Sequence, residues 1–305
     1  MPKTILFIHG RSFKPPKQEL QKLWLDAVRF GMERDHPEKA SDLADAKMEL
    51  VYYGDRSRRF LEKTLKEPYR DDTKDRQLAL AQLKQYSRSQ FNKASYRELP
   101  GYNPWRESLA SLFSSPLNYL GLTESLIEKA APDIGQYWRS YPFGSDIRVL
   151  LTEAIIRAMK RNGEICVIAH SLGSLIAFDV LWKLSHYSEY RDKAWNREID
   201  FWITLGSPIA ADTVRDNLKG ARNSEADRYP KNVRHWLNVS AEDDFICYEP
   251  KVASEFRGMK KLGYVESITD KRIYNLSVRD GKSNPHHSLG YLIHPTVIDA
   301  IADWL

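Results

Sequence analysis

The fold is decided by residues 164–173, which read EICVIAHSLG. The first five form a short apolar run typical of a buried strand, and the residues from Ser174 to Leu184 have a helical pattern. Ser171 lies at the predicted turn between this strand and this helix. A serine between small residues at such a turn is typical of a nucleophile elbow, in which a tight turn exposes the hydroxyl.

The elbow needs small residues two positions before and two positions after the serine. Larger side chains there would collide with the neighbouring strand and helix, and Ala169 and Gly173 meet this requirement. The strained backbone costs about 1–3 kcal/mol, which suggests a function for the turn. A helix beginning directly after Ser171 also directs its free N–H groups at any oxyanion formed there. The alternative is an ordinary turn in which Ser171 caps the helix.

Length and composition indicate a globular chain with one large domain or two smaller ones. The chain has 305 residues, and no stretch approaches the roughly 18 consecutive apolar residues of a membrane span. The amino-terminal residues run directly into an apolar strand without a signal-peptide pattern. We therefore expect a cytoplasmic protein. Its two cysteines, Cys166 and Cys247, suggest structural thiols and no disulfide framework.

The net charge of +5 is concentrated in residues 54–98, which contain twelve lysines and arginines and seven aspartates and glutamates. We expect a solvated helical face in this mixed-sign segment. Attraction to anionic substrates, or peripheral contact with lipid head groups, is the alternative. No nucleic-acid-binding motif accompanies the charge, so we expect no nucleic-acid partner.

Apolar runs rich in β-branched residues alternate with helical patterns along most of the chain. This order predicts an α/β fold, with a mostly parallel sheet flanked by helices on both faces. Strands are expected at residues 4–8, 49–53, 165–169, 200–205, 235–239 and 272–278. Helices are expected at 18–33, in several pieces between 58 and 161, at 172–185, and at 295–305. Ligands of such sheets bind beyond the carboxyl ends of the strands.

Residues 55–140 interrupt this alternation. The segment has no convincing strand, and its leucines are spaced as in amphipathic helices. We expect a helical cap over the strand ends, with the core formed by residues 1–54 and 141–305. Part of the segment could instead be an ordinary layer helix. Trp105, Phe113 and Trp138 are expected either to line an acyl pocket or to form a small core within the insertion.

The order of strand, elbow and helix resembles the α/β-hydrolase superfamily over residues 4–54 and 164–305. The resemblance implies an α/β-hydrolase fold and the chain order nucleophile, acid, histidine, with an oxyanion-hole segment earlier in the chain. Ser171 would be the nucleophile. The His-Gly turn after the first strand would supply one oxyanion donor, the N–H of Arg11, and Leu172 would supply the second.

The resemblance places the acid after the strand at 235–239, where Asp243 and Asp244 are neighbours. Asp244 is preferred because the two apolar residues after it fit the family's turn, and Asp243 is the alternative. Glu242 and Asp212 are worse placed, and we expect Asp212 to cap a helix.

The histidine is expected before the final helix, where His286 and His287 are neighbours. An imidazole titrates near neutral pH and can accept the serine proton. His286 is preferred because a rigid Asn-Pro step precedes it, and His287 stays open. His170 points away from the nucleophile, so we expect packing or a supporting hydrogen bond. His294 is expected at a helix start.

Two further readings are disfavoured. Ser207 lies in a Gly-Ser-Pro turn, and turn chemistry explains it without a catalytic role. A zinc site is opposed by the absence of helical histidine spacing and by the poor geometry of adjacent histidines. The residues of that zinc hypothesis are His286, His287, His294, Asp243 and Asp244.

The expected function is that of a serine hydrolase acting on a small-molecule or lipid ester, thioester or acyl bond. Ser171 would attack the carbonyl, His286 would relay the proton and Asp244 would orient the imidazole. No cofactor or metal is expected. The alternatives are an inactive hydrolase-like binding or scaffold protein, and a phospholipase acting at a membrane surface.

Overall fold

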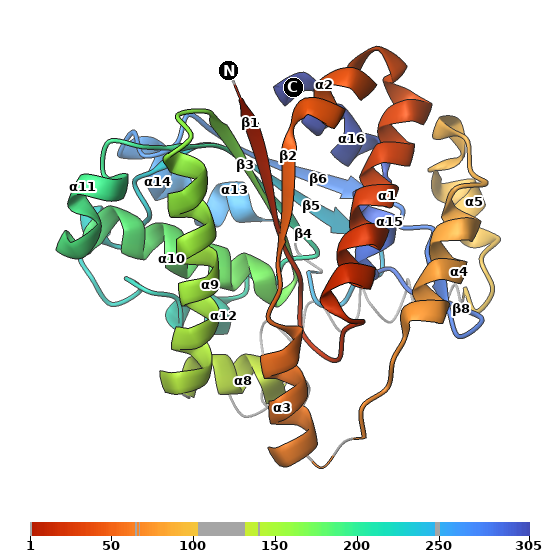
Figure 1. Cartoon of the computed structure of the whole chain (residues 1–305), viewed down its shortest axis with the longest axis horizontal. Coiled ribbons are helices and arrows are strands. Elements are labelled where there is room, and N and C mark those ends of the chain that lie inside the picture. The colour runs from red at the N-terminus through yellow and green to blue at the C-terminus, as the bar shows by residue number, and fades with distance from the viewer. Residues whose placement is uncertain (1, 65, 67, 103–131, 140, 248–250) are drawn as a thin grey trace.

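The computed structural model describes residues 2–64, 66, 68–102, 132–139, 141–247 and 251–305 (Figure 1). Six parallel strands form one sheet in the order β2-β1-β3-β4-β5-β6. They are β1 (Lys3–Ile8), β2 (Lys47–Val51), β3 (Glu164–His170), β4 (Ile199–Leu205), β5 (Val233–Ala241) and β6 (Ser267–Ile273). An antiparallel pair follows, β7 (Val278–Arg279) and β8 (Lys282–Ser283). The predicted α/β class with a parallel sheet is confirmed.

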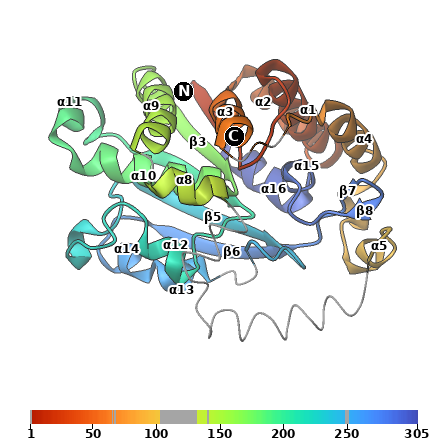
Figure 2. The ribbon, with the colours of Figure 1, turned by 90° about the horizontal axis from the view of Figure 1, so that it is seen from below.

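Helices lie on both faces of the sheet, as predicted (Figures 1 and 2). One face carries α8 (Pro132–Arg139), α9 (Tyr141–Met159), α10 (Leu172–His186), α11 (Arg191–Ala194), α12 (Asp212–Asp216), α13 (Val252–Glu255) and α14 (Arg257–Lys261). The other carries α1 (Lys17–Asp35), α2 (Ala40–Asp45), α4 (Thr73–Leu83), α5 (Lys93–Arg97), α15 (Ser288–Leu292) and α16 (Pro295–Trp304). The helix α3 (Gly54–Thr64) follows β2 and contacts α8.

Both faces of the sheet are buried, which explains why most of its strands read as continuous apolar runs. In β1, Leu6 and Ile8 join the cluster beneath α9 and α10. Ile5 and Phe7, the alternate residues, join the cluster beneath α1, α15 and α16. This division follows from the two-residue period of a strand, and it gives the molecule two cores on one sheet.

Two strands end at residues that need an explanation. The last strand of the parallel sheet, β6, spans Ser267–Ile273, and β7 begins at Val278, so the expected strand at 272–278 is wrong for residues 274–277. β6 is an edge strand with several exposed side chains, and such a strand needs no apolar run. The second strand, β2, ends before the predicted Tyr53 because the N–H of Tyr53 donates to Nε2 of His9 at 3.0 Å instead of to the sheet.

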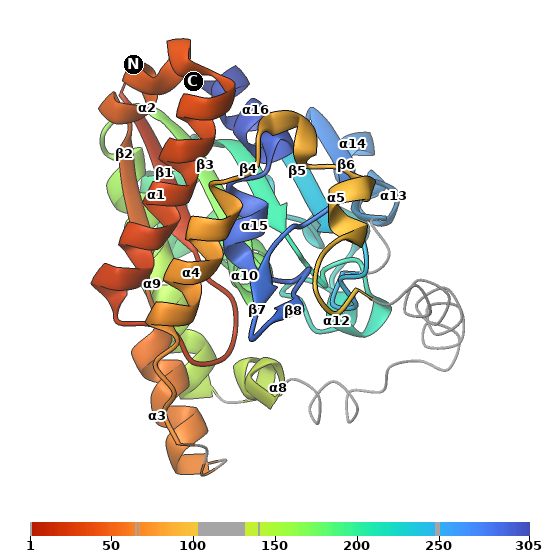
Figure 3. The same cartoon turned by 90° about the vertical axis from the view of Figure 1, so that its right-hand side faces the viewer.

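The described part of residues 55–140 is helical, but its helices lie in two different places. The helix α4 packs against α1 and α15 (Figure 3), so it continues a helical layer. The helix α8 packs against α9, and its Trp138 contacts the core cluster on that side of the sheet. Trp105 and Phe113 lie outside the described residues.

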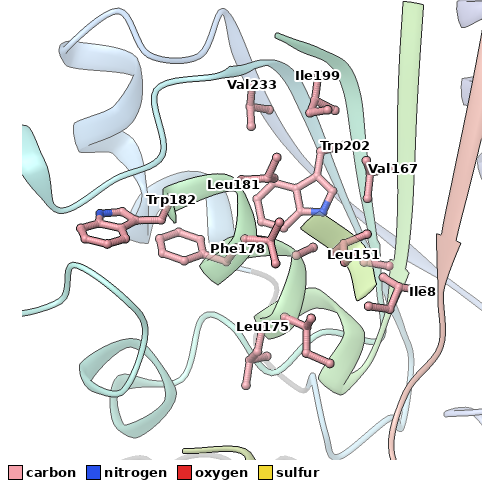
Figure 4. Close-up of a cluster of buried hydrophobic side chains, with 14 of the residues drawn as sticks. Ile8, Leu151, Val167, Leu175, Phe178, Leu181, Trp182, Ile199, Trp202 and Val233 are labelled. Atoms are coloured by element: carbon pink, nitrogen blue, oxygen red, sulfur yellow. The ribbon is translucent and has the colours of Figure 1, made fainter. Parts of the chain in front are cut away.

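Trp202 in β4 is central to the core cluster beneath α9 and α10 (Figure 4). It is buried, and its ring stacks on Trp236 of β5 with centroids 4.1 Å apart. We expect Trp202→Ala to lower the free energy of unfolding by about 3–5 kcal/mol because it leaves a cavity. Urea unfolding measures this change.

The matched control is Trp195→Ala, because the Trp195 side chain is 40% exposed. We expect this change to lower the free energy of unfolding by less than about 1 kcal/mol. Equal losses in the two variants would contradict the central role of Trp202.

Candidate active site

Ser171 lies at the carboxyl end of β3, where the chain turns into α10. Its backbone has φ 56° and ψ −126°, and a positive φ is uncommon for a residue other than glycine. The N–H of Ser171 donates to the carbonyl of Leu205 at 2.9 Å, and its own carbonyl accepts from the N–H of Ser174 at 2.9 Å. The strained strand-to-helix turn expected from the sequence is therefore present.

Two glycines permit close packing around this turn. A Cβ on Gly173 would lie 2.7 Å from the carbonyl oxygens of both Ile8 and His9. A Cβ on Gly10 would lie 2.7 Å from the Cβ of Ser171. Both positions therefore require glycine, and the segment after β1 passes directly beside Ser171.

Three side chains from distant parts of the chain form a continuous line of hydrogen bonds. Nε2 of His286 lies 2.9 Å from the Ser171 hydroxyl, and Nδ1 lies 2.8 Å from Oδ2 of Asp244. An ionised carboxylate only accepts hydrogen bonds, so Nδ1 carries the proton and Nε2 is free to accept from Ser171. The structure thus brings together the serine, histidine and aspartate that the sequence analysis preferred.

Asp244 is buried and makes further hydrogen bonds. Its Oδ2 accepts from the Tyr291 hydroxyl at 2.6 Å, and its Oδ1 accepts from the N–H of Ile246 at 3.0 Å. Burial alone would raise the pKa of this carboxyl, but the charge of His286 and hydrogen bonds from His286 and Tyr291 lower the pKa to about 2. Asp244 is therefore ionised at neutral pH.

Sequence reasoning assigned no role to two residues that lie against this aspartate and histidine. Tyr291, in α15, donates to Asp244 and accepts from the N–H of Ala241 at 2.9 Å. Gly206 has φ +55°, and a Cβ there would lie 3.1 Å from both Asp244 Oδ2 and His286 Nδ1. The strand-end glycine of the Gly-Ser-Pro turn was a signal for Gly206, whereas nothing in the local sequence marks Tyr291.

The histidine and aspartate that the sequence left as alternatives face other partners. Nε2 of His287 lies 3.4 Å from a terminal nitrogen of Arg76. Burial, together with the charges of Arg76 and Arg279, lowers the pKa of His287 well below its usual value. Asp243 accepts a hydrogen bond from the Tyr96 hydroxyl at 2.9 Å. The hydrogen bonds that lead to Ser171 therefore come from His286 and Asp244, and not from His287 and Asp243.

His170 and His294 have the supporting contacts expected of them. Nε2 of His170 donates to the backbone carbonyl of His286 at 2.9 Å and so holds that loop. Burial, reinforced by the charges of His286 and Lys14, lowers the pKa of His170 well below its usual value. His294 precedes α16, and its Nδ1 accepts from the N–H of Thr296 at 3.1 Å.

The lesser candidates also have other contacts. The Ser207 hydroxyl accepts from the N–H of Ile209 at 3.3 Å, which agrees with a turn role. Asp212 pairs with Arg215 inside α12 and does not cap that helix, so the expected cap is wrong. Glu242 pairs with an arginine of β6 at 2.8 Å.

Ser171 and His286 line a cavity of about 250 Å³. Its wall includes residues 11–14, β7, the residues before α15, and part of the basic segment 54–98. The expected solvated face of that segment is found at exposed residues such as Arg59. It is wrong for Arg76, which is buried in the cavity wall and paired with Asp72 at 2.8 Å.

A larger hollow of about 750 Å³ lies at the amino-terminal ends of the strands, where β3, β4 and β5 begin. Lys3, Asp200 and Trp304 are in its wall. Ser171 and His286 are not among its lining residues, so the smaller cavity is the one beside the Ser171 hydroxyl.

Three further features of the described residues concern metal binding, membrane-spanning helices and disulfides. These residues contain no group of three or more histidine, cysteine, aspartate or glutamate side chains that could hold a metal ion. In the same ranges, no helix has both the length and the apolar character needed to cross a membrane. Cys166 and Cys247 are buried free thiols.

No family model, curated protein or solved structure matches this chain. Its chemistry must therefore be inferred from the hydrogen-bonded Ser171, His286 and Asp244 and from the cavity beside them.

The lowered pKa of Asp244 predicts an acid-dependent contribution to stability. The folded carboxyl has a pKa of about 2, below the usual 3.8, so the unfolded state takes up this proton first as the pH falls. The stabilisation is therefore present above about pH 4 and is lost as the pH falls towards 2. Asp244→Asn should lower Tm near neutral pH, and its difference from wild type should narrow below about pH 4.

Thermal unfolding of both proteins from pH 7 down to pH 3 measures this difference. Asp192→Asn, on the exposed surface of α11, is the matched control. A Tm difference for Asp244→Asn that stays constant with pH would contradict the lowered pKa.

Proposed function

We propose that this protein is a serine hydrolase of the α/β-hydrolase type that cleaves a carboxylic ester, thioester or similar acyl bond. The observation that carries the proposal is the hydrogen-bonded line Ser171–His286–Asp244 at a strained turn on a parallel sheet. The cavity supports it, because Ser171 and His286 both lie in its wall. The strand order, with this turn following the central β3, supports the fold assignment.

In the proposed acylation step, Oγ of Ser171 attacks the carbonyl carbon and its proton moves to Nε2 of His286. The ionised Asp244 stabilises the imidazolium formed in this way. His286 then passes the proton to the leaving alcohol or thiol as its bond to the acyl carbon breaks. A water molecule, deprotonated by His286, then attacks the acyl carbon, and His286 returns the proton to Oγ of Ser171 as the bond to the acyl group breaks and the acid leaves. No step requires a cofactor.

The proposed oxyanion donors are the backbone N–H groups of Arg11 and Leu172. Leu172 is the first residue of α10, where an N–H has no acceptor within the helix and the helix dipole is positive. Arg11 follows Gly10, which packs directly on Ser171, and it lies in the cavity wall. Each such donor contributes roughly 3–4 kcal/mol to transition-state stabilisation.

We expect Ser171→Ala to reduce the hydrolysis of 4-nitrophenyl acetate by at least about 1,000-fold, because the attacking oxygen is removed. Ser207→Ala is the matched control, since Ser207 is also a buried serine at a strand end but belongs to a turn. A fluorophosphonate probe should label wild type and Ser207→Ala and leave Ser171→Ala unlabelled. Wild-type protein that resists labelling at every pH would instead support the inactive scaffold.

The neighbouring pairs of candidate residues should behave unequally. His286→Ala and Asp244→Asn should each lower kcat by about 1,000-fold or more, because they remove the base or its orienting acid. His287→Ala and Asp243→Asn should have much smaller effects, since neither side chain joins the line to Ser171. Steady-state kinetics of the four variants on one ester decides this. Equal and partial losses within a pair would contradict the assignment.

A further inference from the structure

The cavity beside Ser171 is strongly cationic. Among the described residues, its lining contains one large apolar side chain, Phe13, and one carboxylate, Asp72. Small-molecule pockets are usually lined by several apolar and aromatic side chains, whereas most of the side chains in this lining are polar or charged. Its five cationic side chains are Arg11, Lys14, Arg70, Arg76 and Arg279. Arg70 also lies near two carboxylates outside the lining, Asp75 and Asp280.

Two of these arginines share the one carboxylate. Oδ2 of Asp72 lies 2.8 Å from a terminal nitrogen of Arg76 and 2.9 Å from a terminal nitrogen of Arg279. Nε of Arg76 also donates to Oδ1 of Asp72 at 2.9 Å. One negative charge thus faces two guanidinium groups. Nε of Arg279 is buried without a hydrogen-bond partner in the described part of the chain.

His287 is a further polar side chain in the wall of this cavity. Its side chain is 5% exposed and lines the wall, and its Nε2 faces Arg76. Its Nδ1 has no hydrogen-bond partner among the described residues. Because burial and the nearby cations keep this ring neutral, it adds a polar group without adding charge.

We propose that this cavity binds the negatively charged group of a small ester, with Arg76 and Arg279 on the carboxylate or phosphate and the ester carbonyl at Ser171. The inference rests on the proposed hydrolase function and narrows its substrate class. A guanidinium group matches the geometry of both carboxylate and phosphate. The volume of about 250 Å³ suits a short soluble ester.

The first test compares two substrates of nearly equal size. These are 4-nitrophenyl hemisuccinate, which carries a free carboxylate, and its methyl ester, which is neutral. Wild-type protein should show a kcat/KM about tenfold or more higher for the anionic ester, because a charged hydrogen bond is gained. This advantage should shrink as salt is added. Equal kcat/KM values for the two esters would overturn the inference.

The second test uses two substitutions that break the same ion pair and change the charge in opposite directions. Arg279→Gln removes a cation and should reduce the preference for the anionic ester about tenfold. Asp72→Asn removes the competing carboxylate and should maintain or increase this preference. A merely structural ion pair would make both variants lose stability and would leave the preference unchanged. The matched control is Arg157→Gln, on the exposed surface of α9.

A third test separates the sources of the anionic group. Succinate, inorganic phosphate and phosphatidylserine vesicles are each added during hydrolysis of 4-nitrophenyl acetate. Competitive inhibition by succinate or phosphate supports the inference, and the stronger inhibitor identifies the preferred anion. Inhibition or activation by vesicles alone would overturn it in favour of a membrane surface.

Failure of this inference and failure of the hydrolase function give different results. If the fluorophosphonate labels Ser171 and the neutral ester is hydrolysed without an anionic preference, the inference fails and the function stands. If no labelling occurs, calorimetric titration with succinate and with phosphate tests the cavity directly. Binding that is lost in Arg279→Gln would then support the anion site, and absence of binding would overturn it.

Discussion

Burial of the Asp244 carboxylate constrains the site more than any other interaction. A buried charge is costly unless paired and hydrogen-bonded, and here His286, Tyr291 and the N–H of Ile246 meet that need. These contacts orient the His286 ring, so that its other nitrogen lies 2.9 Å from the Ser171 hydroxyl. The position of the His286 ring beside the Ser171 hydroxyl therefore depends on the hydrogen bonds that hold the Asp244 carboxylate.

The parallel sheet places these groups within reach of one another. The carboxyl ends of β3 and β5 lie at the same edge of the sheet, so Ser171 and Asp244 meet there although 73 positions separate them. Glycines allow the chain segments to approach closely, since a side chain at Gly10 or Gly206 would contact the serine or the aspartate–histidine pair. The two buried cores then keep this edge rigid.

Positive charge exceeds negative charge in the wall of the cavity beside Ser171. Asp72 lies between two arginines, one from α4 and one from β7, although 203 positions separate Arg76 from Arg279. Part of the positive charge of residues 54–98 thus faces a cavity and not the bulk solvent. The same segment contributes to a helical layer through α4, which ties the cavity wall to the second core.

The α/β class and most strands follow from the local periodicity of the sequence, and Ser171 follows from the small residues around it at a strand-to-helix turn. The preference for Asp244 and His286 came from the resemblance to the α/β-hydrolase superfamily and its chain order. The tertiary structure decided the contacts that no local pattern encodes: Tyr291 on the aspartate, Gly206 against the aspartate–histidine pair, and Arg279 opposite Arg76. It also moved the last strand to Ser267–Ile273, since an edge strand is selected by pairing with its neighbour. Such contacts depend on which distant segments pack together, and that is settled only when the whole sheet forms.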